Sequence, residues 1–141
     1  MILQLRDDAG AVLRKPRYMP QVTVLIVDDA AVIRRMTREL LERRGYTVVA
    51  EADCAATALT LADALAPDAV LLDVRLPDAD GFEVAAAITS AQPNGSPAVL
   101  LMTADPQLGH YAMLEQSGAR GLVAKTDLAC TDLHDFWPAA G

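Results

Sequence analysis

The chain has 141 residues, of which 52% are hydrophobic and 22% are charged, and its formal net charge is −7. This length and composition fit one globular domain with a sizeable core and argue against a disordered chain. The acidic balance argues against a nucleic-acid partner, and the lack of a signal peptide or of an apolar run near the roughly 20 residues of a membrane-spanning helix predicts a cytoplasmic protein without a membrane partner.

Strand-like and helix-like patterns alternate along the chain. Short runs rich in Val, Ile and Leu predict strands buried on both faces, and apolar residues at helical spacing predict the helices. In chain order the predicted elements are strand 22–27, helix 30–44, strand 47–50, helix 55–65, strand 69–73, a helix from 81 to just before 93, strand 98–103, helix 106–117, strand 121–124 and helix 127–137. This alternation predicts an α/β domain with a doubly wound, five-stranded parallel sheet and helices on both faces.

The first predicted helix has an apolar stripe and a basic face. The stripe consists of Ile33, Met36, Leu40 and Leu41. Because these residues recur at helical spacing, we expect them to pack on the sheet. The basic residues off the stripe are Arg34, Arg35 and Arg38. They either face a partner protein or form an ordinary solvated helix face.

Residues 1–21 lie outside this pattern and form an N-terminal extension of unknown structure, whereas the domain occupies residues 22–141. The extension could be a short hairpin around Asp7-Asp8-Ala9-Gly10 or a disordered tail. A further alternative is that Met19 is the natural start of the chain.

Polar side chains gather where four of the predicted strands end. Asp28 and Asp29 follow the first strand, Asp73 ends the third, Thr103 ends the fourth and Lys125 follows the fifth. Each residue alone has an ordinary explanation as a helix cap, a turn residue or a solvated lysine. Ligands of open parallel sheets bind beyond the carboxyl ends of the strands, however, so the whole set predicts a binding site at this edge.

Three carboxylates held within a few ångströms of one another repel. At an effective dielectric constant near 20, one pair about 4 Å apart repels by about 4 kcal/mol. The carboxyl groups must therefore take up protons or share a cation. Oxygen ligands with room for water suit Mg²⁺, and a compact ammonium such as that of Lys125 suits a phosphate group.

These residues stand in segments that resemble a known family. The segments VTVLIVDDA, LLDVRLPDADG, LLMTA and GLVAKTD resemble the signature of bacterial response-regulator receiver domains, and the spacing from Asp29 to Asp73, Thr103 and Lys125 is typical of that family. The resemblance covers about residues 22–137 and is of the single-domain, chemotaxis-response-regulator-like kind. It implies a flavodoxin-like sheet with strand order 2-1-3-4-5.

The resemblance also implies roles for these residues. Asp73 is expected to accept a phosphoryl group from a sensor histidine kinase or a histidine phosphotransfer protein. The carboxylates of Asp28, Asp29 and Asp73 and the backbone carbonyl of Arg75 are expected to hold Mg²⁺, while Thr103 and Lys125 contact the phosphoryl group. Such a protein catalyses only its own phosphorylation and dephosphorylation.

The signal would reach a downstream target by protein docking. We expect docking on the fourth and fifth helices and the fifth strand, because the short segment after Lys125 leaves no room for an output domain. The basic face of the first helix is the candidate kinase-facing surface. A homodimer remains open.

Three departures from the family pattern concern four positions. Leu122 stands three residues before Lys125, where many receivers have a Tyr or Phe whose ring turns inward together with the threonine. Thr126 replaces the proline that usually follows the lysine. We therefore expect Thr126 or Asp127 to cap the last helix. An ion pair between Arg75 and Asp105 over the site would restrict the water that hydrolyses the aspartyl phosphate.

Other function classes explain the pattern less well. A receiver-like interaction module that is never phosphorylated is the first alternative, and Leu122 keeps it open. A phosphatase or phosphotransferase on a related fold would carry D-x-D after the first strand, where this chain has Asp28-Asp29-Ala30. A dinucleotide-binding fold is disfavoured because no G-x-G-x-x-G follows any strand.

Overall fold

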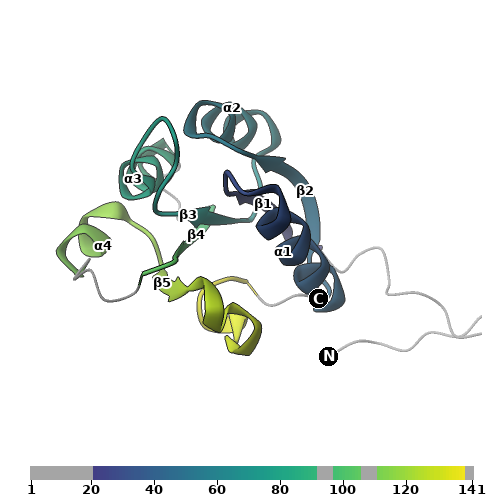
Figure 1. The fold of residues 1–141 in the computed structure, drawn as a ribbon. Coiled ribbons are helices and arrows are strands. Elements are labelled where there is room, and N and C mark those ends of the chain that lie inside the picture. Colours follow the sequence, from purple (N-terminus) through teal and green to yellow (C-terminus); the bar gives the residue numbers. More distant parts are fainter. Residues whose placement is uncertain (1–20, 92–96, 106–110, 139–141) are drawn as a thin grey trace, which may run out of the picture.

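The computed structural model describes residues 21–91, 97–105 and 111–138. Five parallel strands form one sheet in the order β2-β1-β3-β4-β5 (Figure 1). The strands are β1 (Thr23–Val27), β2 (Thr47–Ala52), β3 (Ala69–Asp73), β4 (Ala98–Thr103) and β5 (Gly121–Ala124). The predicted sheet and its strand order are confirmed, and β2 extends two residues beyond its predicted end.

Helices connect the strands as predicted. They are α1 (Ala31–Arg43), α2 (Ala55–Leu65), α3 (Gly81–Ala91) and α4 (Tyr111–Ser117). The predicted first turn of α4, residues 106–110, lies outside the described residues, as does the extension before residue 21. Among the described residues, no helix has the length and apolar character needed to cross a membrane.

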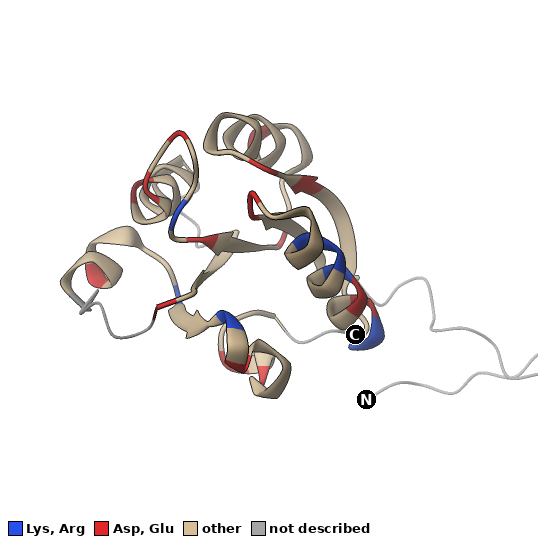
Figure 2. Ribbon diagram, viewed as in Figure 1, with Lys and Arg blue, Asp and Glu red and all other residues tan. Residues whose placement is uncertain are grey.

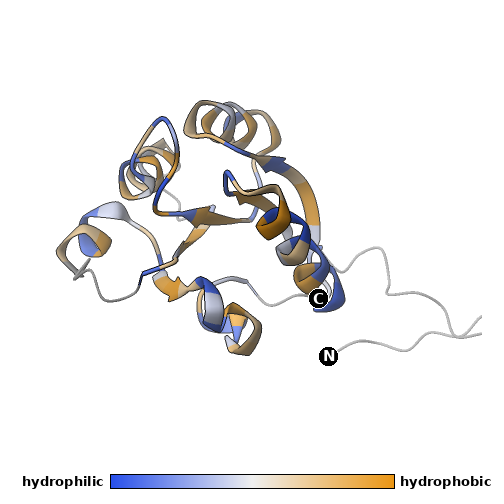
Figure 3. Cartoon of the chain, viewed as in Figure 1, coloured by the Kyte–Doolittle hydropathy of each residue, from blue (hydrophilic) through white to orange (hydrophobic). Residues whose placement is uncertain are grey.

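Both faces of the sheet are buried, because neighbouring strand residues point to opposite sides. Val24, Ile26 and Leu71 belong to one apolar cluster, with α1 and the C-terminal segment. Leu25 and Leu72 belong to the other, with α2, α3 and α4. Figure 1 shows these elements on the two sides of the sheet, and the strands are mostly hydrophobic in Figure 3. Helices on both faces are therefore confirmed.

The apolar stripe predicted for α1 is partly wrong. Thr37 and Leu41 are the buried residues of this helix, and Met36 is 59% exposed. Met36 borders a groove between α1 and the segment after β5, which also contains Ile33 and Leu128. One side of the groove is formed by the segment after β5, which is more irregular than predicted.

The predicted helix over residues 127–137 is wrong. Two short 3₁₀ helices replace it, η1 (Lys125–Cys130) and η2 (Leu133–Asp135). Thr131 between them has extended backbone angles (φ −88°, ψ 136°), and the Asp132 side chain accepts a hydrogen bond from the His134 N–H. Thr and Asp side chains make such local hydrogen bonds in competition with helix formation.

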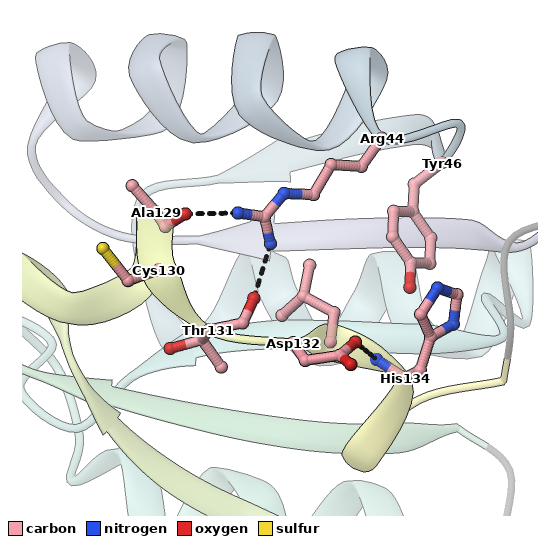
Figure 4. Close-up of a pocket in the computed structure, with 8 residues that line it drawn as sticks. Arg44, Tyr46, Ala129, Cys130, Thr131, Asp132 and His134 are labelled. Carbon is pink, nitrogen blue, oxygen red and sulfur yellow. Dashed lines mark hydrogen bonds between the residues drawn. The ribbon is translucent and has the colours of Figure 1, made fainter.

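Arg44, just after α1, stabilises this irregular segment (Figure 4). Its guanidinium donates hydrogen bonds to the carbonyl oxygens of Ala129 and Thr131. No side chain caps η1, so the predicted caps Thr126 and Asp127 are also wrong.

Trp137 fastens the end of the segment to the core. It is 3% exposed, and its ring meets that of Tyr46 edge-on, with centroids 5.4 Å apart and planes 80° apart. The segment therefore covers one face of the sheet without forming a regular α-helix.

Candidate functional site

Three carboxylates meet at the carboxyl edge of the sheet. Asp28, Asp29 and Asp73 each place an oxygen within 4.8 Å of the others. Asp28 is fully buried, Asp73 is 4% exposed and Asp29 is exposed, so the cluster opens to solvent on one side. Figure 2 shows this acidic group at the ends of β1 and β3.

The backbone around Asp28 fixes the direction of its side chain. Asp28 Oδ1 accepts a hydrogen bond of 2.9 Å from the N–H of Ala30, directly before α1. The N–H of Asp28 donates to the carbonyl oxygen of Ala52 at the end of β2. The carboxylate is thus held by local structure before any ligand binds.

Lys125 enters the cluster from the end of β5. Its Nζ lies 2.7 Å from Asp28 Oδ2 and 2.9 Å from Asp73 Oδ2. Burial alone would lower the pKa of Lys125, but its contacts with the two carboxylates raise the pKa above the usual value. Lys125 is therefore a protonated cation at neutral pH.

Burial has the opposite effect on Asp73. Desolvation raises the pKa of Asp73, and the nearby charge of Asp28 adds to this effect. Hydrogen bonds from Lys125 and from the N–H of Arg75, 3.1 Å from Asp73 Oδ1, offset part of the increase. A buried carboxylate with raised pKa beside a cation is a common feature of reactive sites.

Thr103 completes the arrangement on β4. The residue is 2% exposed, and its hydroxyl accepts a hydrogen bond of 3.0 Å from the N–H of Asp105 and lies 3.2 Å from the carbonyl oxygen of Asp105. Its hydroxyl is therefore engaged by its own loop. A cavity of about 240 Å³ lies between these groups, lined by Asp29, Asp73, Val74, Arg75, Thr103, Ala104, Asp105 and Lys125.

The structure brings all six predicted site residues together at one edge. The three carboxylates, with the adjacent backbone of Arg75, form an oxygen-rich donor set of the kind that binds Mg²⁺. Their mutual repulsion is only partly relieved by Lys125, so a divalent cation fits the charge of the site.

Gly81 lets the loop after β3 turn back against Asp73. A Cβ at position 81 would lie 2.2 Å from the carbonyl oxygen of Asp73 and 2.6 Å from the Cα of Val74. The N–H of Gly81 donates a hydrogen bond of 2.7 Å to the Val74 carbonyl. Only a residue without a side chain therefore fits at position 81 without a shift of the backbone.

Two of the three arginines assigned to a kinase-facing surface are turned toward β2. Arg34 and Arg38 both pair with Glu51, at 3.1 Å and 2.7 Å, whereas Arg35 is exposed. Sequence reasoning missed Glu51, because an acidic residue near the end of a strand carries no local sign of its partner.

The loop after β3 contains a second residue that sequence reasoning missed. The carboxylate of Asp78 accepts hydrogen bonds from the N–H groups of Ala55 and Ala56, at 2.7 Å and 3.0 Å. The N-cap of α2, Cys54, makes no capping hydrogen bond with its side chain, and Asp78 accepts both hydrogen bonds from a distant segment of the chain. The absence of a good cap before α2 was the available signal.

Leu122 is half-buried and packs against the cluster under α2, α3 and α4. It thus places an aliphatic side chain at the position where the family usually has a Tyr or Phe. Arg75 and Asp105 both line the cavity, and an ion pair between them stays a prediction.

Comparisons with known proteins agree with this geometry. Residues 24–134 match the response regulator receiver domain family. The chemotaxis protein CheY of Listeria monocytogenes is 34% identical over 102 residues, which are 72% of this chain and 84% of CheY. The first relatives found are longer regulators, and the chain spans about half of their length.

Solved structures show the same fold. A two-component response regulator of the LuxR family from Aurantimonas sp. SI85-9A1 has a TM-score of 0.71 and 32% identity, over 79% of each chain. A response regulator protein from Burkholderia pseudomallei with a phosphorylated aspartic acid has a TM-score of 0.72 and 26% identity, over 84% of this chain and 68% of that one.

Proposed function

This chain belongs to the family of response regulator receiver domains, and we propose that its phospho-acceptor is Asp73. The family acts as a phospho-accepting switch in two-component signalling. One observation carries the assignment. The buried Asp73 carboxylate lies at the end of β3, between the ammonium of Lys125 and the N–H of Arg75, and lines the open cavity.

In the proposed reaction an oxygen of Asp73 attacks the phosphorus of a phosphohistidine. The new P–O bond forms as the P–N bond breaks, and the electron pair of that bond stays on the histidine nitrogen. Lys125 neutralises charge on the phosphoryl oxygens. Thr103 must release Asp105 before its hydroxyl can donate to the phosphoryl group.

Asp28, Asp29, Asp73 and the backbone carbonyl of Arg75 would hold Mg²⁺. The ion would supply additional positive charge for the transferring group. The phosphorylated aspartic acid in the Burkholderia pseudomallei protein supports the same chemistry in a protein of this fold.

We further propose that the protein modifies only its own aspartate and signals by docking a downstream protein. Sensor kinases or histidine phosphotransfer proteins would be its phosphoryl donors. The net charge of −7 favours protein partners over nucleic acid. Leu122 favours one alternative, a receiver-like module that docks partners without being phosphorylated.

Intact mass spectrometry after incubation with acetyl phosphate and Mg²⁺ tests the proposal. A labile phosphoryl adduct is expected on the wild type and on Asp63→Asn, an exposed carboxylate of α2. It should be absent from Asp73→Asn and from wild type in EDTA. No adduct on the wild type, with no spectral response to beryllofluoride, would support the interaction module instead.

A further inference from the structure

We infer that Arg34, held by Glu51, positions Asp28 and thereby sets the affinity of the acidic cluster for a divalent cation. This inference rests on the proposed function, because it concerns the cation site of the receiver. It assigns a role to two residues outside that site.

The Arg34 guanidinium joins α1 to two other segments. Its Nη1 donates a hydrogen bond of 2.6 Å to the backbone carbonyl oxygen of Asp28, and its Nε lies 3.1 Å from Glu51 Oε1. The Arg34 and Glu51 side chains are only 19% and 29% exposed. Partial burial and a planar, two-directional donor make this a better-defined contact than a typical surface ion pair.

The end of β2 therefore holds both backbone polar groups of Asp28. The N–H of Asp28 donates directly to the carbonyl oxygen of Ala52. The carbonyl oxygen of Asp28 accepts from Arg34, which in turn pairs with Glu51, the residue before Ala52. The Asp28 side chain is fully buried and directed at the cluster. A change in the backbone of Asp28 would consequently shift its carboxylate relative to Asp29 and Asp73.

The charge of Arg34 and its positioning of Asp28 have opposite effects on the affinity for a cation, which makes the positioning role testable. Arg34 is a cation close to the site, so its charge alone would weaken the binding of another cation. If Arg34 acted only through its charge, its removal would tighten cation binding. If it positions Asp28, its removal weakens binding, since partners that orient metal ligands typically contribute about 10–100-fold in affinity.

Arg38 provides a matched control. It also pairs with Glu51, through Oε2 at 2.7 Å, and it lies one helical turn from Arg34. In the described part of the chain its ion pairs are with Glu51 and Glu42, and neither is in the cluster. Removal of Arg38 deletes a similar charge without deleting the contact to Asp28.

The experiment is a titration of the full chain with Mn²⁺, which accepts the same oxygen ligands as Mg²⁺, with free Mn²⁺ measured by electron paramagnetic resonance. Arg34→Ala is expected to weaken binding about 10-fold. Arg38→Ala should stay within about 2-fold of the wild type, because it keeps the Asp28 contact. The Mn²⁺ affinity of Glu51→Gln should fall between those of the two arginine variants. If circular dichroism shows that Arg34→Ala does not fold, Glu51→Gln takes its place in the test.

The outcomes separate this inference from the proposed function. Absence of Mn²⁺ binding by the wild type would overturn the proposed cation site itself. Binding by the wild type with equal or tighter binding by folded Arg34→Ala, or equal weakening by Arg38→Ala, would overturn the positioning role alone.

Discussion

Lys125 donates a hydrogen bond of 2.9 Å from its Nζ to Oδ2 of Asp73, so the proposed nucleophile and its cation are already paired in this structure. The lysine follows β5 and the aspartate ends β3, with β4 between the two strands. Because the sheet fixes both positions, the positive charge needs little reorganisation when a phosphoryl group arrives.

Replacement of Lys125 should therefore slow phosphorylation more than it changes the fold. For Lys125→Ala we expect the initial rate of adduct formation from acetyl phosphate to fall about 100-fold, the size of effect typical for a preorganised charge. Intact mass against time measures the rate. Arg35→Ala removes an exposed cation on α1 and serves as the control. Equal rates for wild type and Lys125→Ala would contradict the role.

The buried charge of Asp73 should reduce stability at neutral pH. Burial raises the pKa of Asp73 in the folded state, so folding favours the protonated carboxyl group. The stability that protonated Asp73 contributes is present below the unfolded pKa near 3.8 and is lost as pH rises through the folded pKa. At pH 7 in EDTA, we expect Asp73→Asn to melt at a higher temperature than the wild type. The difference should shrink as the pH approaches 4, and a lower melting temperature for Asp73→Asn at pH 7 would refute this account.

The sheet and the site could be predicted because both depend on local sequence features. Runs such as Ala69–Asp73 are apolar on both faces, which predicts buried parallel strands, and residues that follow such strands must meet at one edge. Asp73 and Lys125 could therefore be placed together without knowledge of any side-chain contact.

The features that sequence reasoning missed depend on contacts between distant segments. Arg34 looked like a solvent-facing residue of α1, and only the register of β1 with β2 brings Glu51 within its reach. The C-terminal segment has helical spacing, but local hydrogen bonding at Asp132 and the two carbonyl contacts of Arg44 favour 3₁₀ turns. Neither the ion pair of Arg34 with Glu51 nor the 3₁₀ turns can be predicted from helical spacing.

Gly81 has no room for a side chain. The Cβ of Gly81→Ala would lie 2.2 Å from the carbonyl oxygen of Asp73, and the backbone must move to accept it. Overpacking of this kind costs about 1–3 kcal/mol, or more against backbone atoms, and it should also slow phosphorylation by displacing Asp73. Urea unfolding and adduct formation test both effects.

Gly45→Ala separates steric overlap from backbone strain. Gly45 has φ of 91° at the end of α1, and an added Cβ there makes no close contact with the residues that the structure describes. This variant should lose stability, by about 1 kcal/mol, without a change in phosphorylation rate.

The outcome that contradicts the Gly81 prediction is a Gly81→Ala protein as active and as stable as the wild type, which would show that the loop after β3 relaxes freely.

Trp137 should contribute more to stability than its place near the end of the described chain suggests. Trp137→Ala removes a 3% exposed ring from the core and its edge-on contact with Tyr46, so we expect a loss of about 3–5 kcal/mol in the free energy of unfolding. Urea unfolding followed by circular dichroism measures this loss. Tryptophan fluorescence cannot be used, because Trp137 is the single tryptophan and the variant lacks it. Trp137→Phe should be milder, because Nε1 has no hydrogen-bond partner among the described residues; similar losses for both would contradict the packing argument.

Asp78 should stabilise α2 from outside the helix, in a pH-dependent way. Hydrogen bonds from the N–H groups of Ala55 and Ala56 lower the pKa of Asp78 below 3.8. A lowered folded pKa stabilises the fold above the unfolded pKa, and this contribution is lost as pH falls through the folded pKa. Asp78→Ala should therefore have a lower melting temperature than the wild type at pH 7, and the difference should narrow below pH 4.

Asp63→Ala is the control for this effect, because it removes an exposed carboxylate within α2 rather than at its N-terminus. Its melting temperature should differ little from that of the wild type at both pH values. If Asp78→Ala behaved like Asp63→Ala, the contacts at Ala55 and Ala56 would contribute nothing in solution. If instead its deficit persisted unchanged at low pH, the loss would come from the packing of the loop after β3 and not from the charge of Asp78.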